Sequence, residues 1–369
     1  MLHFSCEKAL LQNAVSIAGR AVASKSSISA LEGLLLEGNT ALTLTGYNMQ
    51  TGIRTSFDAQ ITEPGRIVLN AKLLGDIIRR MPDDVVSFSA DDSCVVNLTC
   101  GDASFDIVGL TADDYPEMPE VDDEYSVSIQ QGILKNMIAE TAFAVSTNES
   151  RPVHTGSLFE IDEDGLTVVS VDGFRLALRH EKLEKIEGGA FQFVAPGSAL
   201  KEVENICSGG EDLIEIIRGK RHLLFLCGET QLICRRLEGE FLDYKNAIPR
   251  NNPIVVEVEN KALLESLDRV SVVISEKLKS PVRCLFGDGR VMLSARTGNG
   301  EAKDICLVDG DGMNLEIGFN NRYLMDALRY APAEKVNIEL NSGVSPCVIT
   351  PVDGDEHFLY MVLPVRLKA

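Results

Sequence analysis

The chain has 369 residues, enough for two or three domains, and its 45% hydrophobic and 24% charged residues are typical of a protein that folds around a core. A formal net charge of −20 argues against a uniformly nucleic-acid-binding surface, because contacts to phosphate require Lys and Arg. The nine cysteines contain no CxxC pair, which favours reduced core residues over a disulfide framework or a zinc ribbon. No secretory leader precedes the first elements, and no apolar run approaches the ~18 residues of a membrane span, so we expect a cytoplasmic protein without membrane spans.

The same succession of elements occurs three times, at intervals of roughly 125 residues, and such periodicity indicates like domains in tandem. Each copy begins with an amphipathic helix, predicted after Glu7, from Gln130 and from Asn260. A polar loop and a β-rich run follow in each copy. Repetition of this kind predicts a protein that works by its shape.

A second helix is predicted in each copy, within 70–82, 196–209 and 320–332, where apolar residues recur at helical spacing. The strand-like segments RIVL, AFQFVA and NLEIGF precede these helices, and two alternating apolar runs follow each of them. One unit is therefore expected to contain a strand, a helix, three strands, a helix and three strands. Loops rich in Pro and acidic residues, at 113–124 and 238–253, divide the chain into predicted domains 1–121, 122–249 and 250–369.

This order predicts an α+β fold with two helices on antiparallel sheet in each domain. Edge strands left open by one domain can pair with the next and extend the sheet. If the pairing continues through a second chain, a head-to-tail dimer closes into a ring.

The charge is unevenly distributed. Lys and Arg outnumber Asp and Glu on the helices of the first and last copies, whereas the rest of the chain is strongly acidic. If the helices line one surface, that surface attracts a polyanion while the remainder repels it. The alternative is that helix surfaces simply favour Lys and Arg.

Catalytic and metal-binding motifs are missing. The sequence lacks a Walker loop, a GxGxxG run, HxxxH or HExxH spacing and a GxSxG elbow. The run 309–314 resembles a calcium loop only in part, and a turn between strands explains it better. The acidic pairs at 113–114 and 122–123 lie in a Pro-containing linker, where a solvated loop is the ordinary explanation. We predict no catalytic residue, no metal and no cofactor.

Three stretches then carry a resemblance to a known family: VVSVDGFRLAL from Val168, GEFLDYKNAIP from Gly239 and YMVLPVRL from Tyr360. They are similar to the TDGHRLA, FPDY and MPMRL segments of the bacterial sliding clamp family, the beta subunit of DNA polymerase III, in order and spacing. The resemblance covers the whole chain. It implies three clamp domains per chain and a head-to-tail homodimer that closes around duplex DNA, with helices facing the channel. It also implies a non-enzymatic processivity factor that a clamp loader places on DNA and that binds the replicative polymerase and other proteins through a peptide motif.

By position, the resemblance implies a set of residues that contact DNA without sequence specificity: Arg20, Lys25, Lys72, Arg79, Arg80, Asn148, Arg151, Lys201, Lys277, Lys279, Arg322 and Arg329. It implies a second set that forms a cleft for partner peptides: Val171, Gly173, Arg175, Leu176, Leu242, Ala247, Val344, Pro346, Met361, Val362, Leu363, Pro364, Val365 and Arg366. It implies a dimer interface in which Phe105 and Ile107 face Val273 and Ile274 of the other chain.

Departures from the family pattern indicate an altered cleft. Val171, Phe174, Leu242 and His154 stand where Thr, His, Pro and an apolar residue are expected. Among the positions expected to contact DNA, 152–153 lack the expected aromatic residues and 197–198, at the start of the second helix, lack the expected basic ones.

Other interpretations stay open from the residues alone. The C-terminal YMVLPVRL could be only a final core strand, although Pro364 should end that strand early and leave the tail at the surface. The interface residues could be ordinary domain core. The protein could also be an acidic enzyme with an unrecognised carboxylate pair, or a ring-shaped protein scaffold that binds no DNA.

Overall fold

The computed structural model describes residues 1–122, 125–183, 186–187, 189–274, 280–352 and 357–367. The chain forms two compact units, which we call the first and the second unit. The first contains Met1–Lys135, Lys185–Gly188 and Ser198–Arg236, and the second contains Asn136–Glu184, Gly189–Gly197 and Leu237–Ala369. Because this division cuts through the middle repeat, the domain boundaries at 121 and 249 stay predictions.

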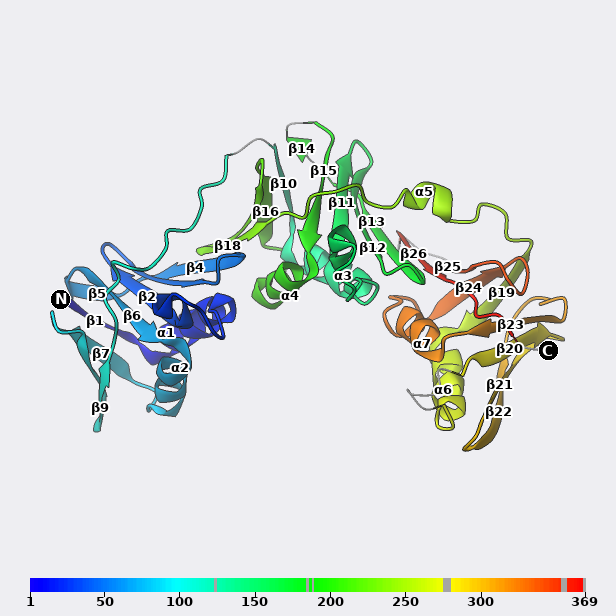
Figure 1. Ribbon diagram of the computed structural model, residues 1–369, viewed down its shortest axis with the longest axis horizontal. Helices are drawn as coiled ribbons and strands as arrows, with labels where there is room; N and C mark the ends of the chain where they lie inside the picture. The colour runs from blue at the N-terminus through cyan, green and yellow to red at the C-terminus, as the bar shows by residue number, and fades with distance from the viewer. Residues whose placement is uncertain (123–124, 184–185, 188, 275–279, 353–356, 368–369) are drawn as a thin grey trace. The chain divides into compact units, whose positions relative to one another are not determined.

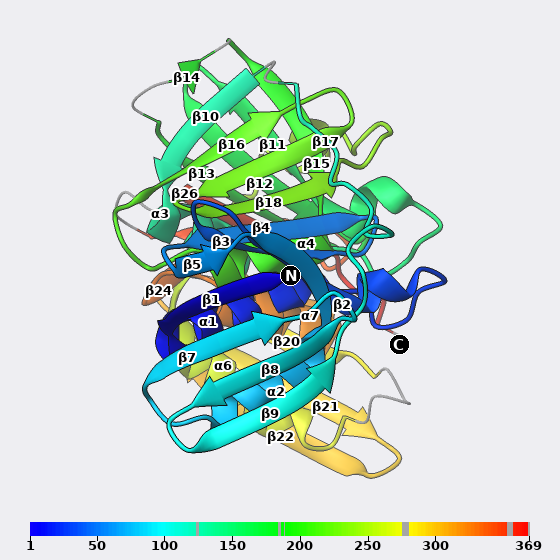
Figure 2. The same cartoon turned by 90° about the vertical axis from the view of Figure 1, so that its left-hand side faces the viewer.

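The first unit is built around two antiparallel sheets, with the helices α1, α2 and α4 (Figure 1). Its elements are β1 (Leu2–Glu7), α1 (Lys8–Ala18), β2 (Gly33–Gly38), β3 (Leu42–Tyr47), β4 (Thr51–Phe57), β5 (Gln60–Glu63), β6 (Gly65–Asn70), α2 (Ala71–Arg80), β7 (Val85–Ala90), β8 (Val95–Cys100), β9 (Ala103–Val108), β10 (Tyr125–Gln130), β14 (Ile186–Glu187), α4 (Gly197–Ile206), β16 (Leu213–Arg218), β17 (His222–Cys227) and β18 (Thr230–Arg235). The strand orders are β5-β1-β7-β8-β9 and β14-β10-β16-β17-β18-β4-β3-β2-β6. Figure 2 looks onto β1, β7, β8 and β9, which lie side by side.

The second unit likewise has two antiparallel sheets, of orders β15-β11-β12-β13-β26-β25-β24-β19 and β22-β21-β20-β23. Its elements are β11 (Gly156–Asp162), β12 (Gly165–Val171), β13 (Arg175–Glu181), β15 (Phe191–Pro196), α5 (Tyr244–Ala247), β19 (Ile254–Glu259), α6 (Asn260–Ser271), β20 (Val282–Gly287), β21 (Arg290–Thr297), β22 (Gly300–Leu307), β23 (Leu315–Phe319), α7 (Asn321–Arg329), β24 (Lys335–Leu340), β25 (Cys347–Pro351) and β26 (His357–Val362). Helix α3 (Gln131–Ala142) begins in the first unit and ends in the second.

Sheets continue from one repeat into the next, as the open edge strands predicted. In the first unit β4 pairs with β18, and buried hydroxyls of Thr55 and Thr230 hydrogen-bond across the pair at 2.9 Å. In the second unit β13 pairs with β26 over six residue pairs, so the C-terminal strand completes a sheet begun by the middle repeat. Continuous pairing leaves no unsatisfied backbone edge at either junction.

The predicted pairs of helices are present in all three repeats as α1 and α2, α3 and α4, and α6 and α7. Three strands follow the second helix of each repeat, as expected. The expectation of three strands between the helices was wrong, because β2–β6, β11–β15 and β20–β23 all lie there. The extra strands are mostly short segments, such as β5 with four residues and β14 with two, which are too brief to produce an alternating pattern. The short α5, in the predicted loop 238–253, was also not expected.

Candidate functional site

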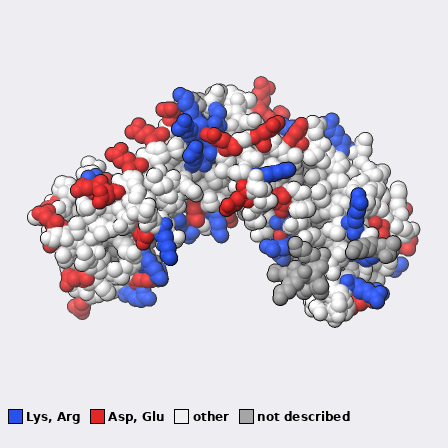
Figure 3. All heavy atoms as spheres, in the orientation of Figure 1, with Lys and Arg blue, Asp and Glu red and all other residues white. Residues whose placement is uncertain are grey.

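An open groove of about 700 Å³ lies beside α1 and α2, two helices that pack against each other in the first unit. The basic side chains of Arg20, Lys72 and Arg79 line this groove together with polar residues such as Gln12 and Ser16. Lys25 follows Ser24, another lining residue, and is exposed. Figure 3 shows Lys and Arg gathered on the side of the first unit where Figure 1 places α1 and α2.

The sequence of α2 explains how it presents these cations. The Asn70 side chain accepts a hydrogen bond from Leu73 N at 2.9 Å and caps the helix. Leu74, Ile77 and Ile78 recur at helical spacing and are buried in the core, where each contributes about 1.5–3 kcal/mol. The helix therefore turns its other face, with its basic side chains, toward solvent.

These cations are weakly engaged within the chain. Arg79 and Arg80 share Asp76 at 3.2 and 3.3 Å, and their side chains are 66% and 68% exposed. Arg20 lies 3.4 Å from Glu202. Exposed ion pairs contribute only about 0–1 kcal/mol, so a phosphate group can replace such a carboxylate at little cost.

The remaining predicted DNA contacts lie elsewhere on the chain. Asn148 and Arg151 are exposed in the loop after α3, and Asn148 Oδ1 accepts a hydrogen bond from Ser150 N. Lys201 is exposed on α4, and Arg322 and Arg329 are exposed on α7. Lys277 and Lys279 lie outside the described residues. The structure thus brings Arg20, Lys72 and Arg79 together in one groove, and Lys201 immediately precedes Glu202, the partner of Arg20.

The predicted peptide cleft corresponds to one face of β12, β13 and β26 in the second unit. Directly paired residues of antiparallel strands point to the same face, so this face carries three rows of side chains. The rows are Val171–Leu176–Met361, Val169–Leu178–Leu359 and Thr167–His180–His357. The first row is buried in an apolar cluster and forms the floor of the predicted cleft.

Most of the other predicted cleft residues surround this floor. Leu363 packs against the cluster and is partly exposed. Ala247 and Pro346 are also partly exposed. Leu242 is 40% exposed and Val344 is 70% exposed. Val362 was wrongly assigned to the cleft, because side chains alternate along β26 and Val362 enters the core on the opposite face.

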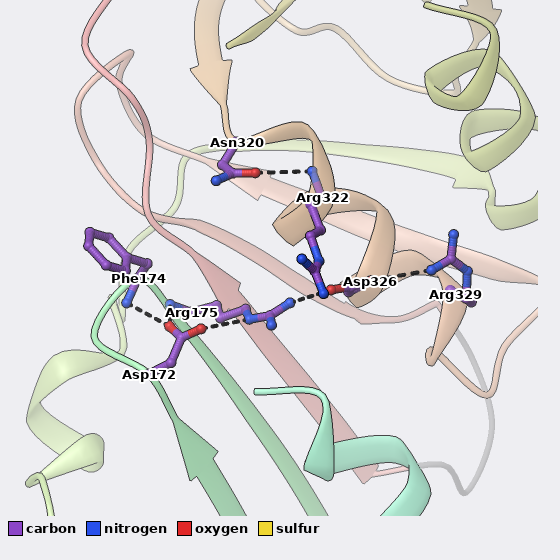
Figure 4. A network of polar contacts seen from close by, with 7 residues as sticks. All are labelled: Asp172, Phe174, Arg175, Asn320, Arg322, Asp326 and Arg329. Atoms are coloured by element: carbon purple, nitrogen blue, oxygen red, sulfur yellow. Dashed lines mark hydrogen bonds and ion pairs between the residues drawn. The ribbon is translucent and has the colours of Figure 1, made fainter. Parts of the chain in front are cut away.

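Arg175 occupies a different position from the one expected of a cleft residue. Its side chain is only 9% exposed, with Nε 2.9 Å from Asp172 Oδ2 and Nη1 2.6 Å from Asp326 Oδ2 (Figure 4). Its guanidinium also lies over the Tyr323 ring, 4.5 Å from the centroid. Arg175 therefore holds the turn between β12 and β13 against α7 and is not free to bind a ligand.

Gly173 makes that turn possible. Asp172 Oδ1 accepts hydrogen bonds from the backbone N–H groups of Phe174 and Arg175, at 2.9 and 3.0 Å. This tight turn requires φ of +89° at Gly173, which side chains with a Cβ rarely adopt. The turn leaves the Phe174 ring 59% exposed beside the predicted cleft.

The C-terminal tail follows the prediction in part. Strand β26 ends at Val362, immediately before Leu363 and Pro364, as expected. The tail is nevertheless anchored, because Leu363 N donates to Phe174 O and Val365 N donates to Gly318 O, each at 2.8 Å. Arg366 beyond it is exposed.

Several aromatic residues near this face were not predicted as site residues. Phe174 stacks on Tyr323 of α7, with ring centroids 6.0 Å apart. Tyr244 of α5 is buried and donates a hydrogen bond to Glu160, and burial together with Glu160 raises the pKa of Tyr244. Phe241 packs edge-on to His154 at 5.4 Å. The stretch from Gly239 already contained two of these residues, so its aromatic content was the available signal.

The two predicted halves of the dimer interface lie beside edge strands. Phe105 and Ile107 belong to β9, the edge of its sheet, and pack partly against the core of the first unit. Val273 and Ile274 follow α6 and pack partly against the core of the second unit, whose four-stranded sheet ends in β22. Exposed apolar side chains on the edges, Val108 of β9 and Leu307 of β22, are 76% and 79% accessible.

The described residues contain no group of three or more His, Cys, Asp or Glu side chains arranged to hold a metal ion. None of the helices in the described residues is long and apolar enough to cross a membrane. Burial raises the pKa of Cys6 and Cys234 to about 12, so both thiols stay protonated and unreactive at neutral pH.

Comparisons with known proteins point to the same family along the whole chain. Sequence models of the DNA polymerase III beta subunit match residues 2–119 with its N-terminal domain, 128–243 with its central domain and 245–366 with its C-terminal domain. The beta sliding clamp of Halalkalibacterium halodurans is 32% identical over 99% of this chain and 100% of its own length. That of Synechocystis is 33% identical over 98% of each.

Solved structures show the same similarity. The DNA polymerase sliding clamp of Bacillus subtilis has a TM-score of 0.94 at 27% identity, covering 100% of both chains. A sliding clamp of Pseudomonas aeruginosa bound to griselimycin has a TM-score of 0.93 at 26% identity, covering 99% of this chain and 100% of the other.

Proposed function

The chain belongs to the DNA polymerase III beta subunit family. On this basis we propose which of its surfaces perform the tasks of a sliding clamp, the non-catalytic processivity subunit that tethers the replicative polymerase to DNA. Its fold is three tandem clamp domains of α+β architecture. Two chains join head to tail into a ring around duplex DNA, which a clamp loader opens and closes. The protein acts in the bacterial cytoplasm.

The α1–α2 groove supplies part of the DNA-facing surface. Its exposed, weakly paired cations on a chain of net charge −20 are the observation that best supports this role. Contacts to phosphate carry no sequence information and allow the protein to move along the duplex. Lys25, Lys72, Arg79 and Arg80 are all exposed and accessible for such contacts.

Strands β9 and β22 form the ring interface. Each is a sheet edge with exposed apolar side chains, and pairing β9 of one chain with β22 of the other covers both edges. Phe105 and Ile107 then approach the region of Val273 and Ile274 in the partner while retaining their contacts with the domain cores.

The face of β12, β13 and β26 binds partner peptides. Apolar anchors of a short linear motif pack on the floor formed by Val171, Leu176 and Met361, with Val344 and Leu242 at the rim. Griselimycin binding by the Pseudomonas clamp supports a ligand-binding role for this protein class.

Retention of the protein on circular and on linear DNA tests the proposal. The protein is loaded onto nicked circular plasmid by a clamp loader and separated from free protein by gel filtration, before and after the plasmid is linearised. A sliding ring stays on the circle and leaves the linear DNA. Equal retention on both, or a monomer in analytical ultracentrifugation, would contradict it.

A further inference from the structure

Two histidines face each other across the β13–β26 pair. His180 and His357 are directly opposed in the antiparallel register, so their Cβ atoms lie about 4.5–5.5 Å apart on the same face of the sheet. Their ring centroids are 6.0 Å apart, with an interplanar angle of 63°. His357 is exposed and His180 is half-buried, so an ion in solvent can reach both rings.

A neighbouring hydroxyl orients one of the two rings. Thr167 Oγ1, on the next strand of the same row, lies 3.0 Å from His180 Nδ1. When Nδ1–H donates to this hydroxyl, Nε2 carries the free lone pair. A hydrogen bond to the other ring nitrogen is the usual device that sets the tautomer and direction of a metal-binding histidine.

We propose that His180 and His357 form a binding site for a divalent transition-metal ion, with water completing the coordination. Two imidazoles on one tetrahedral ion, each with a metal–nitrogen distance of about 2.0–2.1 Å, have centroids roughly 5 Å apart. The observed 6.0 Å reaches this value through a small rotation of the exposed His357 side chain. Neutral imidazole suits Zn²⁺, Cu²⁺ and Ni²⁺.

The surroundings favour this assignment. Apart from the Thr167 hydroxyl, neither ring has a side-chain hydrogen-bond or ion-pair partner among the residues that the structure describes. The next row consists of Leu178 and Leu359, which confines the polar groups to the end of the sheet face. With two protein ligands among the residues that the structure describes, the site binds its ion reversibly.

An ion bound at this position would connect two repeats of the chain. His180 belongs to the middle repeat and His357 to the C-terminal strand, so a shared ion links the two across their sheet junction. An ion that binds only the folded chain raises its stability. This proposal is independent of the clamp function.

Titration calorimetry with Ni²⁺ on the chelator-washed, full-length chain tests the site, because Ni²⁺ favours imidazole. We expect wild type to bind with an affinity that falls at least about 10-fold in His357→Ala and in His180→Ala, and by about 10-fold in Thr167→Val, which removes the orienting hydroxyl. The matched control His222→Ala, whose cross-strand partner is Arg235, should bind as wild type does. Ni²⁺ should also raise Tm in wild type but not in His357→Ala.

Because His357 is exposed, its replacement keeps the fold and leaves the test informative even if His180→Ala is destabilised. Equal Ni²⁺ affinity in wild type and His357→Ala would overturn the proposal. An equal drop in affinity in His222→Ala would do so as well.

Discussion

Arg175 Nη1 lies 2.6 Å from Asp326 Oδ2, although 151 residues separate the two along the chain. The side chains are 9% and 14% exposed. Through this contact the β12–β13 turn beside the predicted peptide cleft is fastened to α7, the helix that carries Arg322 and Arg329 (Figure 4). The ion pair therefore helps to fix the position of the turn that borders the predicted peptide cleft.

Replacing Arg175 with Ala should lower the free energy of unfolding by about 3–5 kcal/mol, because it leaves the carboxylates of Asp172 and Asp326 nearly buried beside an empty space. Urea denaturation measures the decrease. Arg329→Ala is the matched control, since Arg329 pairs with the same Asp326 but is 52% exposed, and it should cost at most about 1 kcal/mol. Equal costs for the two variants would refute the structural role of Arg175.

Reversing the charge of cations beside the α1–α2 groove should weaken DNA retention. The double variant Arg79→Glu/Arg80→Glu should dissociate from nicked circular DNA faster, and the slope of log affinity against log salt should fall by about 0.9 for each phosphate that the protein no longer neutralises. Arg66→Glu/Arg235→Glu changes the net charge equally at exposed strand positions and should behave as wild type. A pure protein scaffold would tolerate both double variants alike.

Placing a charge at the rim of the peptide cleft should weaken partner binding without unfolding the protein. Val344→Glu should reduce affinity for a clamp-binding peptide by roughly 10-fold, because the bound peptide would desolvate the new carboxylate against its apolar anchors. Val344 is 70% exposed, so stability should change little. Fluorescence anisotropy measures binding, and Leu213→Glu, at a 61% exposed apolar position in the first unit, is the control. Unchanged affinity in Val344→Glu would remove this residue from the cleft.

Stability should decrease as the pH falls below about 6.5, partly because of His154. Burial, and to a lesser extent the charge of Arg151, lowers the pKa of His154 from its ordinary 6.5. Between the lowered value and 6.5 the unfolded chain binds the additional proton, so protonation favours unfolding. The pKa of His222 is lowered by burial and by Arg235 and Arg221, which adds to the same trend.

His154→Leu should therefore lose less stability than wild type between pH 7.5 and 5.5, as measured by urea denaturation at both values. Comparing the two proteins cancels the contributions of the carboxylates that they share. An identical pH dependence in both would show that His154 titrates normally in the folded chain.

Much of the fold was predictable because its signals are local. The 3.6-residue apolar spacing located α2 and α7, and alternation located β7, β8 and β24. Strands as short as β5 and β14 were missed, because their pairing depends on neighbours far along the chain rather than on their own residues. Val362 was misassigned since register decides which face a side chain occupies.

The sequence by itself determined the threefold repeat, the order of the elements, the uneven charge and the family, because propensity, periodicity and motifs are properties of short segments. Only the tertiary structure decided that Arg175 forms a nearly buried ion pair with Asp326, that Met361 lies in the floor of the predicted peptide cleft, and that His180 faces His357. These relationships arise when strands and helices distant in the chain dock in one register, and packing, not local preference, selects that register.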